Sequence, residues 1–143
     1  MNNWFEVKIR YEKMHESGIV KMTTESYLVD AWSFTEAEAR GNEELEPYMQ
    51  GEFQLTAVGR KKYSELILDK GEYYYEAMVA LITLDEKSGT EKNTNCRILV
   101  QADSVYNATE SVEELMEKSM VAYRIKSVKE TPIIDVFLAK EDR

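Results

Sequence analysis

The chain repeats itself at an offset of 71 residues. Residues 16–39, ESGIVKMTTESYLVDAWSFTEAEA, align with residues 87–110, KSGTEKNTNCRILVQADSVYNATE, and nine of the 24 aligned positions are identical. With the offset reduced to 70, residues 43–67 align with residues 113–137, where Glu-Glu-Leu recurs and the apolar pattern agrees. The one-residue slip therefore falls between Ala39 and Glu43. Such a period predicts two copies of one supersecondary unit that share a core.

Each copy predicts two strands, a helix and two more strands. A Ser-Gly pair, which is a turn signal, separates the first strand from the second in both copies. Alternation and short apolar runs mark the strands themselves. The four strands are expected at residues 4–13, 20–31, 52–58 and 63–68 in the first copy, and at 73–85, 90–102, 122–128 and 133–138 in the second.

Both helices have recognisable start signals. Ser33 followed by Glu36 fits a capping box, and Asp103 or Ser104 can cap the second helix. Pro47 is expected to end or kink the first helix near Glu46. The apolar stripes are expected to include Phe34, Ala37, Gly41 and Leu45 in the first helix, and Val105, Ala108, Val112, Leu115, Met116 and Met120 in the second.

These elements predict an α+β fold with two helices and antiparallel sheet, built of internally duplicated ββαββ units that are related by a pseudo-twofold axis. One such unit is too small to bury much surface, so we expect residues 1–143 to form a single domain of two repeats, residues 1–70 and 71–143.

Most enzymatic readings find no support in the sequence. The single histidine, His15, lies in a polar loop, and Cys96 lies in an expected strand without a histidine nearby. No cluster has zinc spacing, and VGRKK lacks the second glycine and the Ser/Thr of a phosphate-binding loop. We therefore expect a protein that is not an enzyme, with no cofactor and no metal.

The net charge of −9 is unevenly distributed. The two helical windows, residues 33–50 and 103–120, each hold five acids and one base, and so carry −8 of the total. The rest of the chain has 17 acids against 16 bases. Acidic helices and nearly balanced strands leave room for a cationic surface on the sheet.

Basic residues near aromatic residues on the strands suggest a ligand. Cations neutralise phosphates and aromatic rings stack on unpaired bases, so this combination is typical of single-stranded nucleic-acid binding. Lys and Arg are also common on solvated strand faces, and the aromatic residues could equally belong to a core or a dimer seam. The candidate contacts are Trp4 for stacking and Lys8, Arg10, Arg60, Lys61, Lys62, Arg124 and Lys126 for phosphates.

The stretches NWFEVKIRYEK, SYLVDAWSFTEAEA, LITLDEKSGTEK and ETPIIDVF resemble an uncharacterised family of small bacterial proteins that also occur in phages and mobile elements. The resemblance spans residues 3–137, implies no catalytic residues, and is similar in its genomic association to replication accessory proteins. Residues and resemblance together favour a binding protein for single-stranded nucleic acid in a phage or mobile-element context.

The alternative is a protein–protein adaptor or structural component that forms a homodimer or docks partners through strand edges. The N-terminus lacks a secretory leader pattern, no apolar run could cross a membrane, and a single cysteine excludes an internal disulfide. We therefore expect a cytoplasmic setting and no membrane partner.

Overall fold

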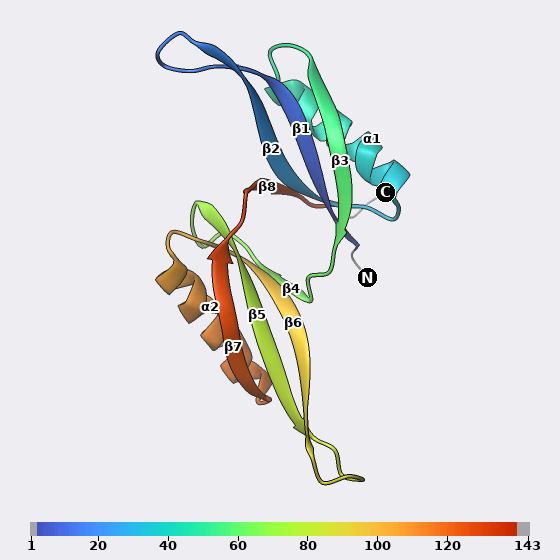
Figure 1. The fold of residues 1–143 in the computed structure, drawn as a ribbon, viewed down its shortest axis with the longest axis vertical. Coiled ribbons are helices and arrows are strands. Elements are labelled where there is room, and N and C mark those ends of the chain that lie inside the picture. The colour runs from blue at the N-terminus through green and yellow to red at the C-terminus, as the bar shows by residue number, and fades with distance from the viewer. Residues whose placement is uncertain (1–2, 140–143) are drawn as a thin grey trace. The chain divides into compact units, whose positions relative to one another are not determined.

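Over residues 3–139, the part of the chain that is described, the computed structural model contains eight strands, two α-helices and one short 3-10 helix (Figure 1). The α+β class predicted from the sequence is confirmed. The first half comprises β1 (Trp4–Met14), β2 (Val20–Asp30), α1 (Phe34–Leu45), the 3-10 helix η1 (Glu46–Tyr48), β3 (Phe53–Lys61) and β4 (Glu65–Ile67). The second half comprises β5 (Tyr73–Leu84), β6 (Glu91–Ala102), α2 (Val105–Ser119), β7 (Ala122–Glu130) and β8 (Ile133–Phe137).

The turns, helix caps and proline predicted from the sequence lie at the expected positions in the structure. Gly18 and Gly89 have φ angles of 83° and 70°, which confirms a tight turn at each Ser-Gly pair. The Oγ atoms of Ser33 and Ser104 accept from the third helical N–H groups, at 3.1 Å in both cases, so Ser104 is the cap of α2. Pro47 falls inside η1, directly after the end of α1, as expected.

The strands form two four-stranded sheets with an exchange between the halves. One sheet has the order β3-β1-β2-β8 and the other has the order β4-β6-β5-β7. Strand β8 therefore completes the sheet of the first half, and β4 completes the sheet of the second. The expected antiparallel sheet is found where β1 pairs with β2 and β3, and where β5 pairs with β6 and β7, whereas β8 pairs with β2 and β4 pairs with β6 in parallel.

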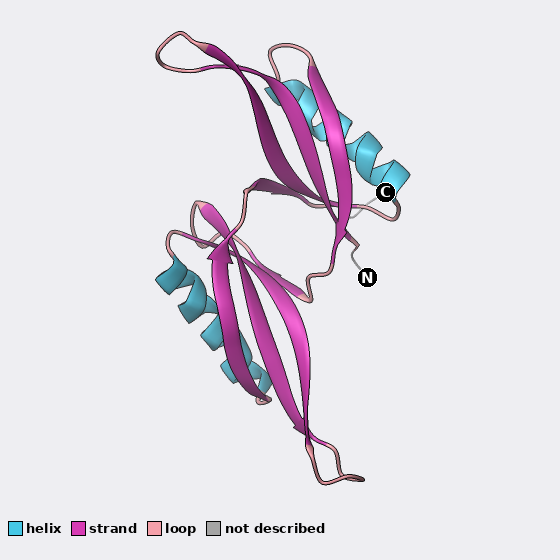
Figure 2. Ribbon diagram, viewed as in Figure 1, coloured by secondary structure: helices cyan, strands magenta, loops and turns pink. Residues whose placement is uncertain are grey.

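The exchange defines two compact units. The first unit holds residues 3–62 and 132–139 of the described chain, and the second holds residues 63–131. The second unit is thus one continuous segment, whereas the first needs β8 from the far end of the sequence. In each unit the helix lies along one face of its own sheet (Figure 2).

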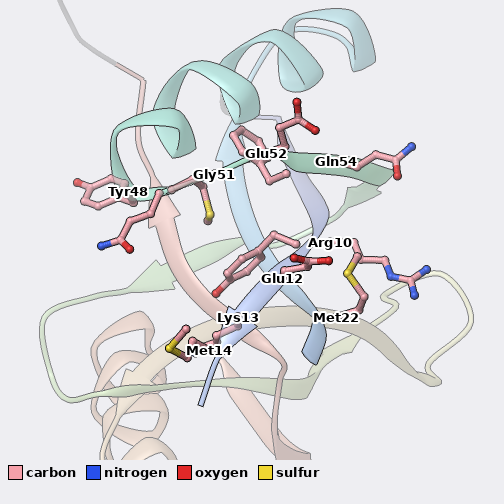
Figure 3. A pocket seen from close by; sticks show the side chains of 13 residues that line it. Arg10, Glu12, Lys13, Met14, Met22, Tyr48, Gly51, Glu52 and Gln54 are labelled. Carbon is pink, nitrogen blue, oxygen red and sulfur yellow. The ribbon is translucent and has the colours of Figure 1, made fainter. Parts of the chain in front are cut away.

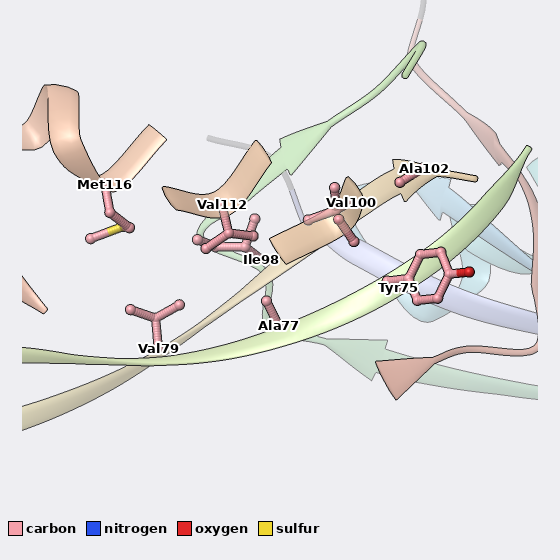
Figure 4. Close-up of a cluster of buried hydrophobic side chains, with 9 residues drawn as sticks. Tyr75, Ala77, Val79, Ile98, Val100, Ala102, Val112 and Met116 are labelled. Carbon is pink, nitrogen blue, oxygen red and sulfur yellow. The ribbon is translucent and has the colours of Figure 1, made fainter. Parts of the chain in front are cut away.

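The space between helix and sheet is filled by apolar side chains. In the second unit Val112 of α2 is fully buried with Val79 and Val100 of the sheet (Figure 4). Burying a valine side chain of this kind contributes about 1.5–3 kcal/mol. The ends of the expected stripes do not belong to the cores, because Val105 and Met120 are 48% and 93% exposed.

The first unit has a smaller helix-side core that includes Val7, Ile9 and Leu45. Phe34 was expected in this core but is 53% exposed. Its ring contacts that of Phe5 edge to face, with 5.0 Å between the ring centres. Arg40 is the larger surprise, because it is only 5% exposed. Its guanidinium donates to the carbonyl oxygen of Asp30, and to that of Leu138 at 3.0 Å. The one base of the α1 window therefore anchors the chain that follows β8.

Candidate nucleic-acid interface

The sheet of the first unit has one face that α1 does not cover. Alternate residues of a strand point to opposite faces, and Val7 and Ile9 of β1 point to the core. Lys8 and Arg10 therefore point to the other face, where both are exposed. Their cross-strand neighbours are short or uncharged: Ser26 and Ala57 lie beside Lys8, and Thr24 and Gln54 lie beside Arg10. We call the residues of this face the sheet A platform.

On the platform face of β1, Glu6 and Glu12 flank Lys8 and Arg10. Within residues 3–139 neither Lys8 nor Arg10 makes an ion pair or a side-chain hydrogen bond. The four charges on this strand face sum to zero, so the face does not attract an anion by net charge, but the Lys8 ammonium and the Arg10 guanidinium remain available as hydrogen-bond donors. The platform therefore offers phosphate-binding chemistry without first having to break an internal contact.

The remaining predicted residues of the first unit are divided between environments. Lys61 lies on the same face as Lys8, but its Nζ is 3.6 Å from a carboxylate oxygen of Glu6. Arg60 lies on the helix side, where its guanidinium is 5.8 Å from the centre of the Phe5 ring. Lys62 is exposed just after β3. The basic run 60–62 is therefore not one cationic patch.

Trp4 occupies the platform face at the end opposite to Arg10. It is only 5% exposed, so its ring presents no open surface on which a base could stack. Any stacking at this interface needs another aromatic residue.

The second unit also has a sheet face that its helix leaves uncovered. Arg124 lies there beside Ala80, while Lys126 is the extra residue at an irregularity in the pairing of β5 with β7. Arg97 and Lys129 share the Arg124 face, through their pairing with Met78 and Glu76, and both are exposed. Sequence reasoning left Arg97 out, although the period-two pattern Asn93, Asn95, Arg97 could have indicated it.

A pocket of about 940 Å³ adjoins the sheet A platform where β3 begins, at Phe53. The pairing of β3 with β1 stops at Phe53 and Tyr11, while β1 continues to Met14. This difference in length leaves a notch along β1. Figure 3 shows Tyr48, Gly51, Glu52 and Gln54 on one side of the notch and residues of β1 on the other. The full lining is Arg10, Tyr11, Glu12, Lys13, Met14, Met22, Tyr48, Met49, Gln50, Gly51, Glu52, Phe53 and Gln54.

Tyr48 is the exposed aromatic residue of this pocket. Its side chain is 74% exposed. Tyr48 is the last residue of η1, which contains Pro47 and follows directly on α1. A helix continuing past Leu45 would carry this residue elsewhere, so Pro47 positions it at the notch. Sequence reasoning missed Tyr48, because its place in the same pocket as Arg10 depends on where β3 begins beside β1.

The carboxylate of Glu25 interacts with side chains that line the pocket. Glu25 accepts from the Tyr27 hydroxyl at 3.0 Å and lies 3.6 Å from the Nζ atom of Lys13. Burial, with a hydrogen bond to Glu25 and its negative charge, raises the pKa of Tyr11 to about 12. The same causes raise the pKa of Tyr27. Both phenols stay protonated at neutral pH and hold Glu25 in place.

Two other kinds of site were searched for within residues 3–139. No group of three or more His, Cys, Asp or Glu side chains there could hold a metal ion. Neither α1 nor α2 is long and apolar enough to cross a membrane.

The chain belongs to the family described as domain of unknown function DUF4494, whose model matches residues 3–139. This confirms the resemblance to an uncharacterised family that the sequence motifs indicated. No curated protein and no solved structure matches the chain.

Proposed function

We propose that this protein binds single-stranded nucleic acid through the sheet A platform and the pocket beside it. The observation that carries the proposal is the pair of exposed cations Lys8 and Arg10, which have no ion pair within residues 3–139, beside a pocket that Arg10 and the exposed Tyr48 both line. Phosphates would lie over the cations, and bases would lie in the pocket, because the platform residues Trp4, Ser26 and Leu28 are at most 5% exposed.

The charge distribution supports this location. Five of the acids lie on the helical segment of each half, and the helix covers the opposite face of the sheet. A polyanion is therefore repelled by the helical side and reaches the protein most easily at the platform. The net charge of −9 also predicts weak binding.

The test is a titration of labelled single-stranded oligonucleotide at several salt concentrations. Each phosphate contact adds about 0.7 to the slope of log affinity against log salt for a single strand, so Lys8→Ala with Arg10→Ala should lower the slope by about 1.4. The matched control is Lys70→Ala with Lys87→Ala, which removes the same charge from exposed positions off the platform. Absence of binding at micromolar protein and low salt, or equal slopes for both double variants, contradicts the proposal.

We further propose that the two halves descend from one duplicated ββαββ unit and act as a single domain, in a phage or mobile-element setting. Two features support the duplication. The order of elements is the same in both halves, and the pairing of the first strand with the third shifts register at Lys8/Ile9 and at Met78/Val79, 70 positions apart. Aligned relatives should keep this offset; relatives with an unrelated second half would contradict the duplication.

A protein–protein adaptor is the second candidate function. The β1–β2 hairpin favours it, because Met14, Ile19 and Met22 near its turn are 70%, 53% and 52% exposed. Exposed apolar side chains grouped in this way are typical of docking surfaces. Light scattering distinguishes the two functions: a dimer that Met22→Lys dissociates supports the adaptor, and a monomer that binds oligonucleotide supports the lead.

A further inference from the structure

The pocket at the start of β3 differs in chemistry from the sheet A platform next to it. Its charged lining residues are Arg10, Lys13, Glu12 and Glu52, so its formal charge is zero. Lys13 is also paired with Glu25 at 3.6 Å. The pocket as a whole therefore has no net attraction for phosphate, which would lie at its edge on Arg10, and the rest of the lining can accept a flat uncharged group.

The uncharged lining residues are suited to a heterocycle. Tyr48 offers the face of an exposed ring, and Met22 and Met49 offer adaptable apolar contact. Gln50 and Gln54 each carry an amide that can donate and accept hydrogen bonds, as the edges of a base require. The volume of about 940 Å³ leaves room for more than one base, since pockets for whole ligands span about 300–1,000 Å³.

We propose that this pocket holds unpaired nucleobases of the bound strand, with one base stacked on Tyr48 and its phosphates on Lys8 and Arg10. This inference rests on the proposed function and assigns different roles to the platform and the pocket. The cationic side chains of the platform bind the phosphates, and the pocket supplies contacts that only a base can use.

The decisive comparison is between an all-thymine oligonucleotide and an abasic one of the same length. Both carry the same phosphates, so they differ only in what the pocket can hold. Stacking of one base is expected to strengthen binding by about 5- to 150-fold, so Tyr48→Ala should weaken binding of the thymine strand by that factor. Tyr48→Phe, which keeps the ring, should bind as the unchanged protein does.

The same two proteins are then titrated with the abasic strand. It should bind the unchanged protein more weakly, and Tyr48→Ala should not weaken its binding further. The matched control is Tyr106→Ala on α2, which removes a ring of similar exposure, 71%, that does not line the pocket. With iodouracil in the strand, illumination should crosslink the tryptic peptide that contains Tyr48.

The outcomes separate the two proposals. Equal affinity for abasic and thymine strands, unchanged by Tyr48→Ala, overturns the base pocket and leaves the platform intact. Absence of binding to either strand overturns both proposals, and binding of an apolar peptide at Tyr48 in place of a base assigns the pocket to the adaptor function. Because Tyr48 is 74% exposed, its variants are expected to fold, which circular dichroism checks.

Discussion

Gly71 allows a direct test of how tightly the second unit is built. It lies in the short connection between β4 and β5, which passes against the end of β6. A Cβ atom at this position would stand 2.3 Å from the carbonyl carbon of Ala102 and 2.4 Å from the backbone nitrogen of Asp103. Both neighbours are backbone atoms, so no side-chain rotation can make room.

The loss of unfolding free energy in Gly71→Ala can be worked out from the backbone atoms that must move. Adding one methyl group to a packed site typically costs about 1–3 kcal/mol. The same backbone carries further contacts, because Asp103 accepts from the Glu72 N–H at 3.0 Å and Ser104 caps α2. Loss of one of these hydrogen bonds adds about 1 kcal/mol, while reduced freedom of the unfolded chain returns about 0.4–1 kcal/mol. We expect a net loss of about 2–3 kcal/mol.

Urea unfolding followed by far-ultraviolet circular dichroism measures this loss. In a thermal scan the same change lowers the midpoint by roughly 8 °C or more, since 1 kcal/mol corresponds to about 4–8 °C in a domain of this size. Gly59→Ala is the matched control: nothing lies within 4 Å of its added Cβ atom, so it should be neutral or stabilising by up to about 1 kcal/mol. If Gly71→Ala unfolded at the same urea concentration as Gly59→Ala, the close packing of this connection would be refuted.

Three further predictions concern local features. Ser104→Ala should lower the unfolding free energy by about 1 kcal/mol in urea titrations, because it removes the acceptor for the Asn107 N–H. The raised pKa of Tyr11 contributes stability below pH 10 that is lost as the pH rises through about 12, so Tyr11→Phe should flatten the fall in urea midpoint over that window. Residues 63–131 expressed alone should keep their fold but unfold at a lower urea concentration than the whole chain, whereas residues 1–62 should need β8 to fold, as dispersion of amide NMR signals and urea titration would show.

The local elements were predictable because their signals act over a few residues. Ser33 caps its helix through an atom three residues away, and Gly18 sets a turn by its own φ angle. The apolar stripes were less reliable at their ends. Val105 and Met120 fit the period of α2, but they lie beyond the part of the helix that packs on the sheet, and period alone does not show where packing ends.

The candidate site was predictable only in part, for a similar reason. The alternation of β1 correctly separates Lys8 and Arg10 from the core side of the strand. The run at residues 60–62 could not be assigned to one face, because successive strand residues alternate and Arg60 and Lys61 point apart. Tyr48 and Arg10 line the same pocket only because β1 extends past the start of β3, which no pattern within either strand records.

The exchange of β4 and β8 was not predicted, yet it follows from the length of the connections. Strand β3 is at one edge of its sheet, and the free edge of β2 lies three strand spacings away, about 14 Å. A fourth strand there would run parallel to β2 and begin near Tyr27, whereas β3 ends level with Asp30, about 10 Å further along.

The chain from Lys61 to Glu65 has four steps and reaches at most about 14 Å, while the combined displacement is about 17 Å. Strand β4 therefore cannot return to the sheet of β3. The connection from Glu130 to Ile133 is shorter still, so β8 is under the same restriction. With this strand order and these connections, each half must give its fourth strand to another sheet. A chain with two such halves provides that sheet itself, which explains why one unit is continuous and the other is completed from the far end of the sequence.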